Sequence, residues 1–187
     1  MAKSASLMQI GAYMGRLLEH RRRPDLGNLA SVPRKRRAEA LVAACGLRVV
    51  EHGGGPAYDY DADLILMPTR ARYWLRRIIR LQASYPLELL HEAAHATGHR
   101  TRLSRPLFIE RFDTIYNREE CVAEMASVML MHDLDISRRP TLPHAKYLNT
   151  YLATLPNAEV ELDVAAAKAN QITAYLLALS RSGRASA

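Results

Sequence analysis

The amino-acid sequence predicts an α+β fold in which a small β-sheet packs against a bundle of helices. The chain has 187 residues, 49% of them hydrophobic and 24% charged, which is typical of one globular domain. Short segments rich in strand-forming residues are confined to residues 47–67. Helical patterns follow them, and strands that precede helices, instead of alternating with them, indicate the α+β class.

Residues 1–35 are predicted to form an N-terminal segment made of an amphipathic helix and a basic linker. Between residues 4 and 20, apolar side chains recur every three or four positions, which predicts a helix that needs a partner surface. These positions are Leu7, Ile10, Met14, Leu17 and Leu18. Prolines and glycine interrupt residues 21–33, as in a linker.

Residues 36–180 are predicted to form the main domain, with residues 181–187 as a disordered tail. Residues 34–44 favour a helix, and Gly46 lies where a C-terminal cap is expected. Strands are predicted at 47–51, 57–60 and 64–67, with a turn at 53–56, which together indicate a three-stranded meander. Five helices are predicted to follow, at residues 69–83, 86–98, 117–133, 144–154 and 157–180.

Cysteine content and hydropathy indicate the compartment. Cys45 and Cys121 lie far apart and lack CxxC spacing, which favours free thiols in a reducing cytosol. No uninterrupted apolar stretch approaches the roughly 20 residues that a membrane span requires. We therefore expect a soluble cytoplasmic protein without membrane contacts. A domain of this length can fold without a structural metal, so we expect any metal site to have a chemical role, not a structural one.

Charge is concentrated at the N-terminus. Residues 1–50 contain ten Lys or Arg and three Asp or Glu, an excess that equals the whole net charge of +7. Such asymmetry indicates that the N-terminal segment contacts an anionic partner, with nucleic acid as the first candidate and a solvated, solubilising tail as the alternative. Near the end of this N-terminal segment, the residues that could contact phosphates are Arg34, Lys35, Arg36 and Arg37. Further candidates lie on the predicted helix 69–83, at Arg76, Arg77 and Arg80. That helix has a simpler interpretation, one packed face and one solvated face.

The residues that indicate chemistry are His91-Glu92-Ala93-Ala94-His95. Histidines four apart on a helix lie on one face, so both rings can bind one ion, and tetrahedral zinc suits this spacing. Glu92 lies to the side, where its carboxylate can take a proton from water activated by the metal. The alternative is a pair of core histidines beside a surface glutamate.

Catalytic zinc usually has three protein ligands, so a third must be found. Position 101, where metzincins place a third histidine, is Thr101. Glu120 and Glu124 lie four apart beside an apolar helical stripe, and we expect Glu120 to bind the metal and Glu124 to orient a histidine, with the reverse as the alternative. His99 is a possible further ligand, but contact with the substrate or support of a metal ligand is the role that we favour for it. Tyr116 is either a donor to an oxyanion or a packing residue.

Several separated motifs, in order, give the chain a family resemblance. They include Glu51-His52-Gly53-Gly54, Met67-Pro68, the stretch from Leu89 to His99 and the stretch from Tyr116 to Glu124. From about residue 36 to 180 the sequence resembles the zincin-like metallopeptidase domain of the ArdC antirestriction proteins and, more distantly, metallopeptidases of the ImmA/IrrE type. The resemblance implies a gluzincin-type site with His91, His95 and Glu120 as ligands and Glu92 as general base. Longer ArdC-type proteins carry a preceding domain that binds single-stranded DNA, whereas only about 35 basic-rich residues precede the match here.

These observations predict a zinc-dependent metallopeptidase, with Mn²⁺ as the alternative metal, acting on a peptide or protein in an antirestriction or mobile-element setting. One alternative is a binding protein that keeps the scaffold and acts by contact with single-stranded DNA or a protein partner. Another is a proteolytic regulator that cuts one partner only.

Overall fold

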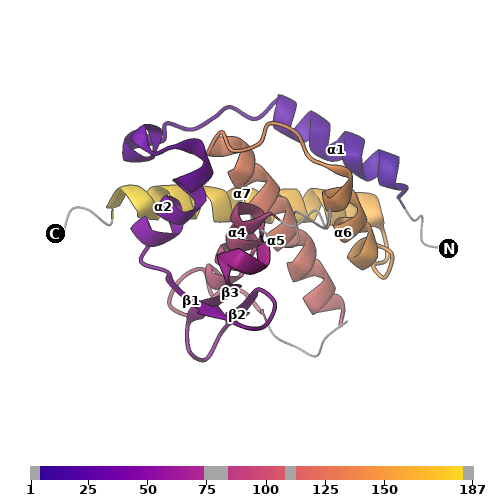
Figure 1. Cartoon of the computed structure of the whole chain (residues 1–187). Helices are drawn as coiled ribbons and strands as arrows, with labels where there is room; N and C mark the ends of the chain where they lie inside the picture. Colours follow the sequence, from indigo (N-terminus) through magenta and orange to yellow (C-terminus); the bar gives the residue numbers. More distant parts are fainter. Residues whose placement is uncertain (1–4, 74–83, 108–112, 183–187) are drawn as a thin grey trace.

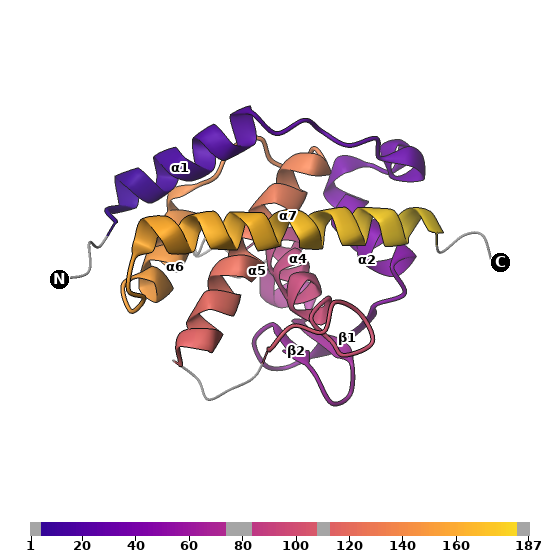
Figure 2. The same ribbon diagram turned by 180° about the vertical axis from the view of Figure 1, so that it is seen from behind.

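The computed structural model describes residues 5–73, 84–107 and 113–182. Helix α5 packs against α4, α6 and α7, and the small sheet lies on one side of this bundle (Figure 1). Seen from behind, the long helix α7 crosses over α5 and α4 (Figure 2). The predicted α+β class is therefore confirmed. No helix in these described ranges is both long and apolar enough to cross a membrane.

The helices lie close to their predicted positions, except that Gly27–Ser31 forms a short 3-10 helix within the segment predicted to be a linker. They are α1 (Leu7–Glu19), η1 (Gly27–Ser31), η2 (Arg34–Arg36), α2 (Arg37–Ala44), α4 (Tyr85–Ala96), α5 (Thr114–Asp133), α6 (Leu142–Leu152) and α7 (Ala158–Ser182). Helix α5 begins three residues earlier than predicted, because the Asp113 side chain caps it at the backbone N–H of Thr114. Of the predicted helix 69–83, the chain from Arg70 to Tyr73 is helical, and Arg76, Arg77 and Arg80 lie outside the described residues.

The sheet is not the predicted meander. Strands β1 (Arg48–His52) and β2 (Ala57–Asp59) do not pair with each other, and both pair with β3 (Leu64–Pro68) in the order β1-β3-β2. Strand β1 runs parallel to β3, and β2 runs antiparallel to it. The central strand buries Ile65 and Met67 completely, whereas β1 is largely exposed. Burial of the most apolar strand therefore decides the order, and residues 53–56 carry the chain past β3 to its other edge.

Helices α4 and α5 pack against each other, and both bury several small side chains. Ala93, Ala94 and Ala96 of α4 and Ala123 and Ala126 of α5 are all fully buried. The distance between two packed helices depends on the side chains at their contact. Polar side chains of the two helices can therefore meet across this interface.

Helix α1 finds its predicted partner surface on the same chain. A capping box starts the helix, in which Ser6 and Gln9 exchange hydrogen bonds between side chain and backbone. Ile10 and Met14 are fully buried on the face predicted to be apolar. The helix packs against α6, and the Tyr13 hydroxyl donates to Asp163 of α7 over 2.7 Å.

The basic segment after α1 is tied to the bundle by ion pairs. The Arg21 guanidinium donates to both carboxylate oxygens of Asp133, over 2.7 and 2.6 Å, and to the hydroxyl of Thr173. The Asp133 side chain is 1% exposed, so its charge depends on partners inside the protein. Arg21 thus holds the end of α1 against α5 and α7.

Replacing Arg21 by Ala should therefore lower the free energy of unfolding by about 3 kcal/mol, because it leaves Asp133 as a buried charge without its main partner. Urea denaturation measures this change. The neighbouring Arg22 is exposed, and Arg22→Ala should change stability by no more than about 0.5 kcal/mol. Equal effects of the two substitutions would contradict the assignment.

Candidate metal centre

Helix α4 aims two imidazoles at one point. His91 and His95 lie one turn apart on its buried face, and their Nε2 atoms are 3.1 Å from each other. Two atoms bound to one zinc ion at about 2.1 Å and a tetrahedral angle lie roughly 3.4 Å apart. The helical repeat alone therefore brings the two nitrogens to a spacing that suits a shared ion.

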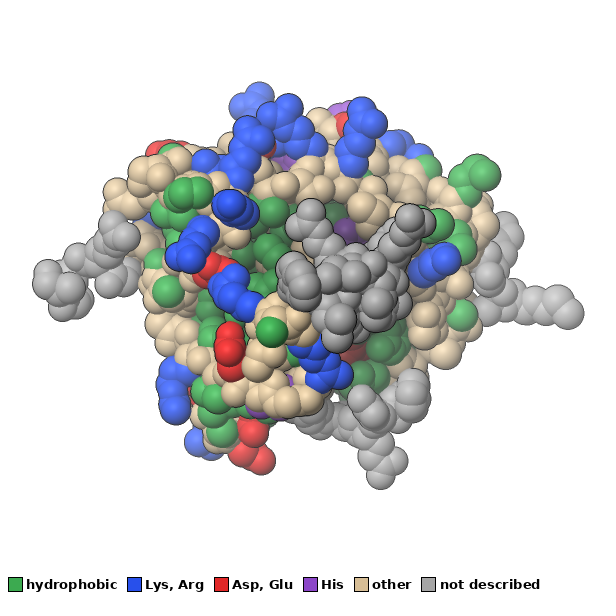
Figure 3. All heavy atoms as spheres, in the orientation of Figure 1, with side chains coloured by type: hydrophobic (Ala, Val, Ile, Leu, Met, Phe, Trp, Pro, Cys, Tyr) green, Lys and Arg blue, Asp and Glu red, His purple; other side chains and the backbone are tan. Residues whose placement is uncertain are grey.

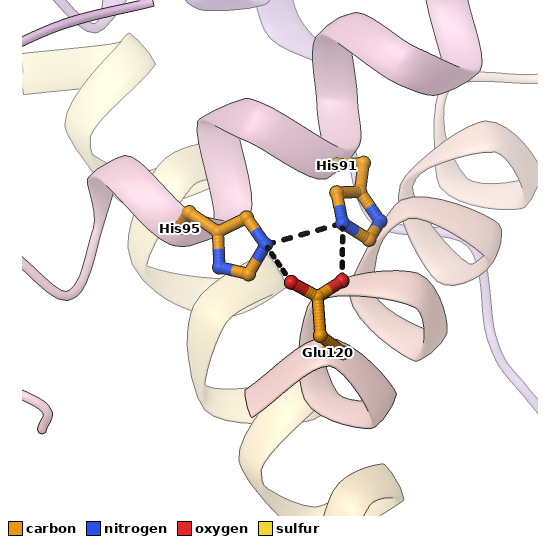
Figure 4. Close-up of side chains that lie close together, drawn as sticks. All are labelled: His91, His95 and Glu120. Carbon is orange, nitrogen blue, oxygen red and sulfur yellow. Dashed lines mark hydrogen bonds and ion pairs between the residues drawn. The ribbon is translucent and has the colours of Figure 1, made fainter. Parts of the chain in front are cut away.

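Helix α5 supplies a carboxylate to the same point (Figure 4). The Glu120 Oε2 atom lies 3.4 Å from His91 Nε2, and its Oε1 atom lies 3.7 Å from His95 Nε2. The three side chains offer ligand atoms that all lie within 4.8 Å of one another. Two nitrogens and one carboxylate oxygen in this arrangement fit a divalent cation with an open coordination position.

The outward nitrogens of both imidazoles face carboxylates. His91 Nδ1 lies 3.3 Å from Glu124 Oε2, and His95 Nδ1 lies 3.4 Å from Glu119 Oε1. Such carboxylates fix the ring orientation and leave Nε2 free for a metal. Glu120 therefore faces the inner nitrogens of both imidazoles, and Glu124 lies behind His91. Sequence reasoning missed Glu119, because only glutamates four apart were paired.

Arg105 is a second residue that the sequence did not reveal. Its guanidinium donates to Glu119 Oε1 over 2.7 Å, to the Thr97 hydroxyl and to the carbonyl of Ala94. Arg105 thereby ties Glu119 to the end of α4, the helix whose His95 the same carboxylate faces. Nothing in the local sequence pattern distinguishes this arginine from a surface one.

The charges of the site support cation binding. Burial raises the pKa of the Glu120 carboxyl, but contacts with His91 and His95 outweigh it and lower the pKa to about 2. Burial also opposes ionisation of Glu124, and His144 and His91 overcome it and lower its pKa. Both carboxylates are therefore anionic at neutral pH and face the imidazoles as negative charges.

Glu92 differs from the other glutamates of the site. Burial is the main reason that its pKa is raised, while His91 and His95 act in the opposite direction. Its side chain makes no hydrogen bond within the part of the chain that the structure describes. It is thus a buried carboxyl beside the cluster that is not engaged by another described side chain.

A cavity of about 400 Å³ opens onto the cluster. Its walls include His91, Glu92, His95 and Glu120, the start of β2 at Ala57 and Tyr58, and the phenols of Tyr116, Tyr147 and Tyr151. A second cavity of about 320 Å³ adjoins the same residues and shares Pro56, His91, Glu92 and Tyr147 with the first. Glu92 therefore borders both cavities.

His99 and Tyr116 take different places. His99 Nδ1 lies 2.7 Å from the Thr101 hydroxyl and its ring lies against Tyr60, so it stands apart from the three converging ligands. Tyr116 lines the larger cavity. Burial and the negative charge of Glu120 raise the pKa of Tyr116, which keeps a neutral phenol next to the cluster.

The four basic residues predicted to contact phosphates are not equivalent. Arg37 donates to the carbonyl groups of Val32, Leu134 and Ala30, so its guanidinium serves the fold. Arg34 pairs with Asp135 but remains 62% exposed, and Arg36 is 71% exposed near Glu39. Lys35 is exposed as well.

A family model described as zincin-like metallopeptidase matches residues 36–168. The chain belongs to this family. Protein y4eC of Sinorhizobium fredii, which is uncharacterised, is 33% identical over 154 residues, covering 82% of the chain and 48% of y4eC. The DNA primase TraC of Escherichia coli is 32% identical over 146 residues, covering 78% of the chain and 10% of the primase. The chain thus spans about half the length of y4eC and about a tenth of the length of the primase TraC.

Solved structures of the antirestriction protein ArdC from plasmid R388 share the fold. The Mn(II)-bound form aligns with a TM-score of 0.59 and 27% identity, covering 78% of this chain and 52% of ArdC. The metal-free form aligns with a TM-score of 0.55 and 26% identity. The predicted resemblance to ArdC is therefore confirmed, and the fold family implies a divalent metal.

Replacing the central carboxylate and the outer one should affect metal binding differently. Glu120→Ala should abolish tight binding of Zn²⁺ or Mn²⁺, whereas Glu124→Ala should keep one ion per chain with about 10- to 100-fold weaker affinity. Metal analysis of the purified proteins and calorimetric titration of the metal-free forms give both quantities. Loss of the ion in Glu124→Ala together with retention in Glu120→Ala would reverse the assignment.

Proposed function

We propose that this chain is a metallopeptidase that hydrolyses a peptide bond of a peptide or protein substrate. The observation that carries the proposal is the free, buried carboxyl of Glu92 next to the converging ligand atoms of His91, His95 and Glu120, within an open cavity. A general base must stand within reach of the water that it activates, and it works best with a pKa near the operating pH. The raised pKa of Glu92 moves it in this direction.

The two histidines and Glu120 would hold the cation. The donor set of two imidazoles and one carboxylate suits zinc, and Mn²⁺ accepts the same donors with a lower intrinsic affinity. When bound, the cation would polarise the scissile carbonyl and acidify the attacking water. The Mn(II) in the ArdC structure makes manganese a second metal to test.

Glu92 would then move one proton through the reaction. Its carboxylate removes a proton from the attacking water while the water oxygen bonds to the carbonyl carbon. The protonated Glu92 returns this proton to the amide nitrogen as the carbon–nitrogen bond breaks, which releases an amine and a carboxylic acid; the acid then gives its proton to the amine, so that the products leave as an ammonium and a carboxylate. The base is thereby regenerated, as hydrolysis requires.

Glu92→Gln should abolish hydrolysis and leave metal binding intact, because the amide keeps the shape of the side chain but accepts no proton. The expected loss is at least about 10²-fold in kcat. Measurement requires a peptide library or a candidate protein substrate, together with metal analysis of the variant. Full turnover by Glu92→Gln would show that another group is the base.

A specific surface feature favours a second function, contact with single-stranded DNA. Arg23 and Arg34 lie 2.6 and 2.7 Å from Asp135, and Arg138 approaches the same carboxylate at 3.5 Å. One carboxylate cannot neutralise these guanidinium groups together with Arg37, 4.0 Å away. Figure 3 shows Lys and Arg side chains gathered along the upper edge of the molecule, where the segment between α1 and α2 runs in Figure 1. Guanidinium groups with positive charge in excess favour phosphate.

If this surface binds a strand, the triple variant Arg34→Gln, Lys35→Gln, Arg36→Gln should weaken binding and flatten its salt dependence. Each lost phosphate contact on a single strand reduces the slope of log K against log salt by about 0.7, so the slope should fall by about 2. Fluorescence anisotropy with a labelled oligonucleotide at several salt concentrations measures it. Arg48→Gln, on the exposed strand β1, is the matched control, and an unchanged slope in the triple variant would exclude this surface.

A further inference from the structure

Helices α5 and α6 face each other through two matched rows of side chains. Helix α5 presents Tyr116, Glu120 and Glu124, each four residues from the next. On α6, residues spaced by three and four positions share one face, and these are His144, Tyr147 and Tyr151. Because the first residue of one row meets the last residue of the other, the rows run antiparallel.

Three contacts connect these rows. His144 Nδ1 lies 2.7 Å from Glu124 Oε1, and the Tyr147 hydroxyl donates to Glu120 Oε2 over 2.6 Å. The rings of Tyr116 and Tyr151 meet at a centroid distance of 6.0 Å in an edge-on arrangement. Each carboxylate of α5 that takes part in the metal centre therefore has its own donor on α6.

We propose that helix α6 is a positioning element of the metal centre, in which Tyr147 holds the ligand carboxylate of Glu120 and His144 holds the orienting carboxylate of Glu124. Neither residue is proposed to touch the cation. The inference rests on the metal-binding part of the proposed function and does not require that the protein cleaves peptides.

The contact of Tyr147 selects one oxygen of Glu120. With Oε2 engaged by the phenol of Tyr147, Oε1 is the oxygen that faces His95, 3.7 Å from its Nε2 atom. A carboxylate held in this way binds a metal through one oxygen more readily than through two, which keeps a coordination position open. The Tyr147 ring also packs edge-on against His91, with centroids 5.5 Å apart, so one side chain restrains two ligands.

His144 contacts Glu124, which lies one turn after Glu120 on α5. The two oxygens of Glu124 are divided between His144 on one side and His91 on the other. His144 and Glu124 are both more than 90% buried, so water cannot replace this donor without cost. Without it, Glu124 could rotate away from His91, and the imidazole would lose the partner that sets its orientation.

The fold holds α6 in place for this role. Helix α1 packs against α6, and Asp135, in the connection between α5 and α6, is paired with Arg23 and Arg34 of the N-terminal segment. This segment lies before residue 36, where the family match begins. Support for the metal centre therefore extends beyond the matched region.

The test compares two phenols that each donate to a carboxylate. Tyr147→Phe should weaken Mn²⁺ and Zn²⁺ binding by about 10- to 100-fold, the usual effect of removing an outer partner of a ligand. Tyr13→Phe removes the hydrogen bond to Asp163, at a tyrosine that lines neither cavity beside the cluster, and should leave both affinities within twofold of wild type. Calorimetric or dye-competition titration of the metal-free proteins gives the affinities, and thermal unfolding without metal confirms that both variants fold.

A double-mutant cycle separates positioning from a general structural effect. In a Glu120→Gln background, Tyr147→Phe should have a much smaller effect on affinity than in the wild type, because the carboxylate that the phenol orients is already gone. Equal effects in both backgrounds would overturn the role of Tyr147. At the second contact, His144→Leu should weaken binding, and His144→Asn, which keeps a donor, should restore most of it.

These measurements also separate the inference from the proposed reaction. If wild type binds metal and Tyr147→Phe binds it weakly, the role of α6 stands even when no peptide is cleaved. Mn²⁺ and Zn²⁺ affinities of Tyr147→Phe within twofold of wild type would overturn the inference, whatever the hydrolytic activity. A wild-type protein that binds neither ion would overturn both.

Discussion

The convergence of two imidazoles and a carboxylate at the α4–α5 interface is the constraint on which the rest of the structure depends. Helices α4 and α5 pack against each other, and His91, His95 and Glu120 meet between them. Buried groups of this kind are unfavourable unless each finds a partner, and the local arrangement gives every one of them a partner. The interface is thus a polar cluster enclosed by an apolar bundle, and a divalent cation suits its three converging atoms.

Support for this cluster comes from segments that are distant in the sequence. Arg105 holds Glu119 behind His95, and helix α6 holds Glu120 and Glu124 through Tyr147 and His144. The basic N-terminal segment is itself part of this support, because its arginines pair with the end of α5 and with the connection to α6. The basic residues of the N-terminal segment therefore fall into two groups. Some form ion pairs that stabilise the fold, and others leave their guanidinium groups exposed to solvent.

Features that depend on short stretches of sequence could be predicted, and those that depend on assembly could not. The positions of most helices followed from apolar periodicity, and the pair His91 and His95 followed from the helical repeat. The strand order was wrong, since local propensity identifies strands but does not identify their neighbours. Tyr147, His144 and Arg105 were missed for a related reason, because each becomes significant only through a partner that packing brings to it.

The sequence by itself determined which side chains share a helical face, so it contained the spacing of the two histidines and of Glu120 and Glu124. Backbone hydrogen bonds within a helix impose that spacing regardless of the surroundings. Only the tertiary structure decided which carboxylate meets the inner nitrogens and which stands behind His91. It also decided that β3 lies between β1 and β2 and that the Arg37 guanidinium donates to backbone carbonyl groups of the same chain. These outcomes depend on how surfaces from separate segments fit together, and no local pattern encodes that fit.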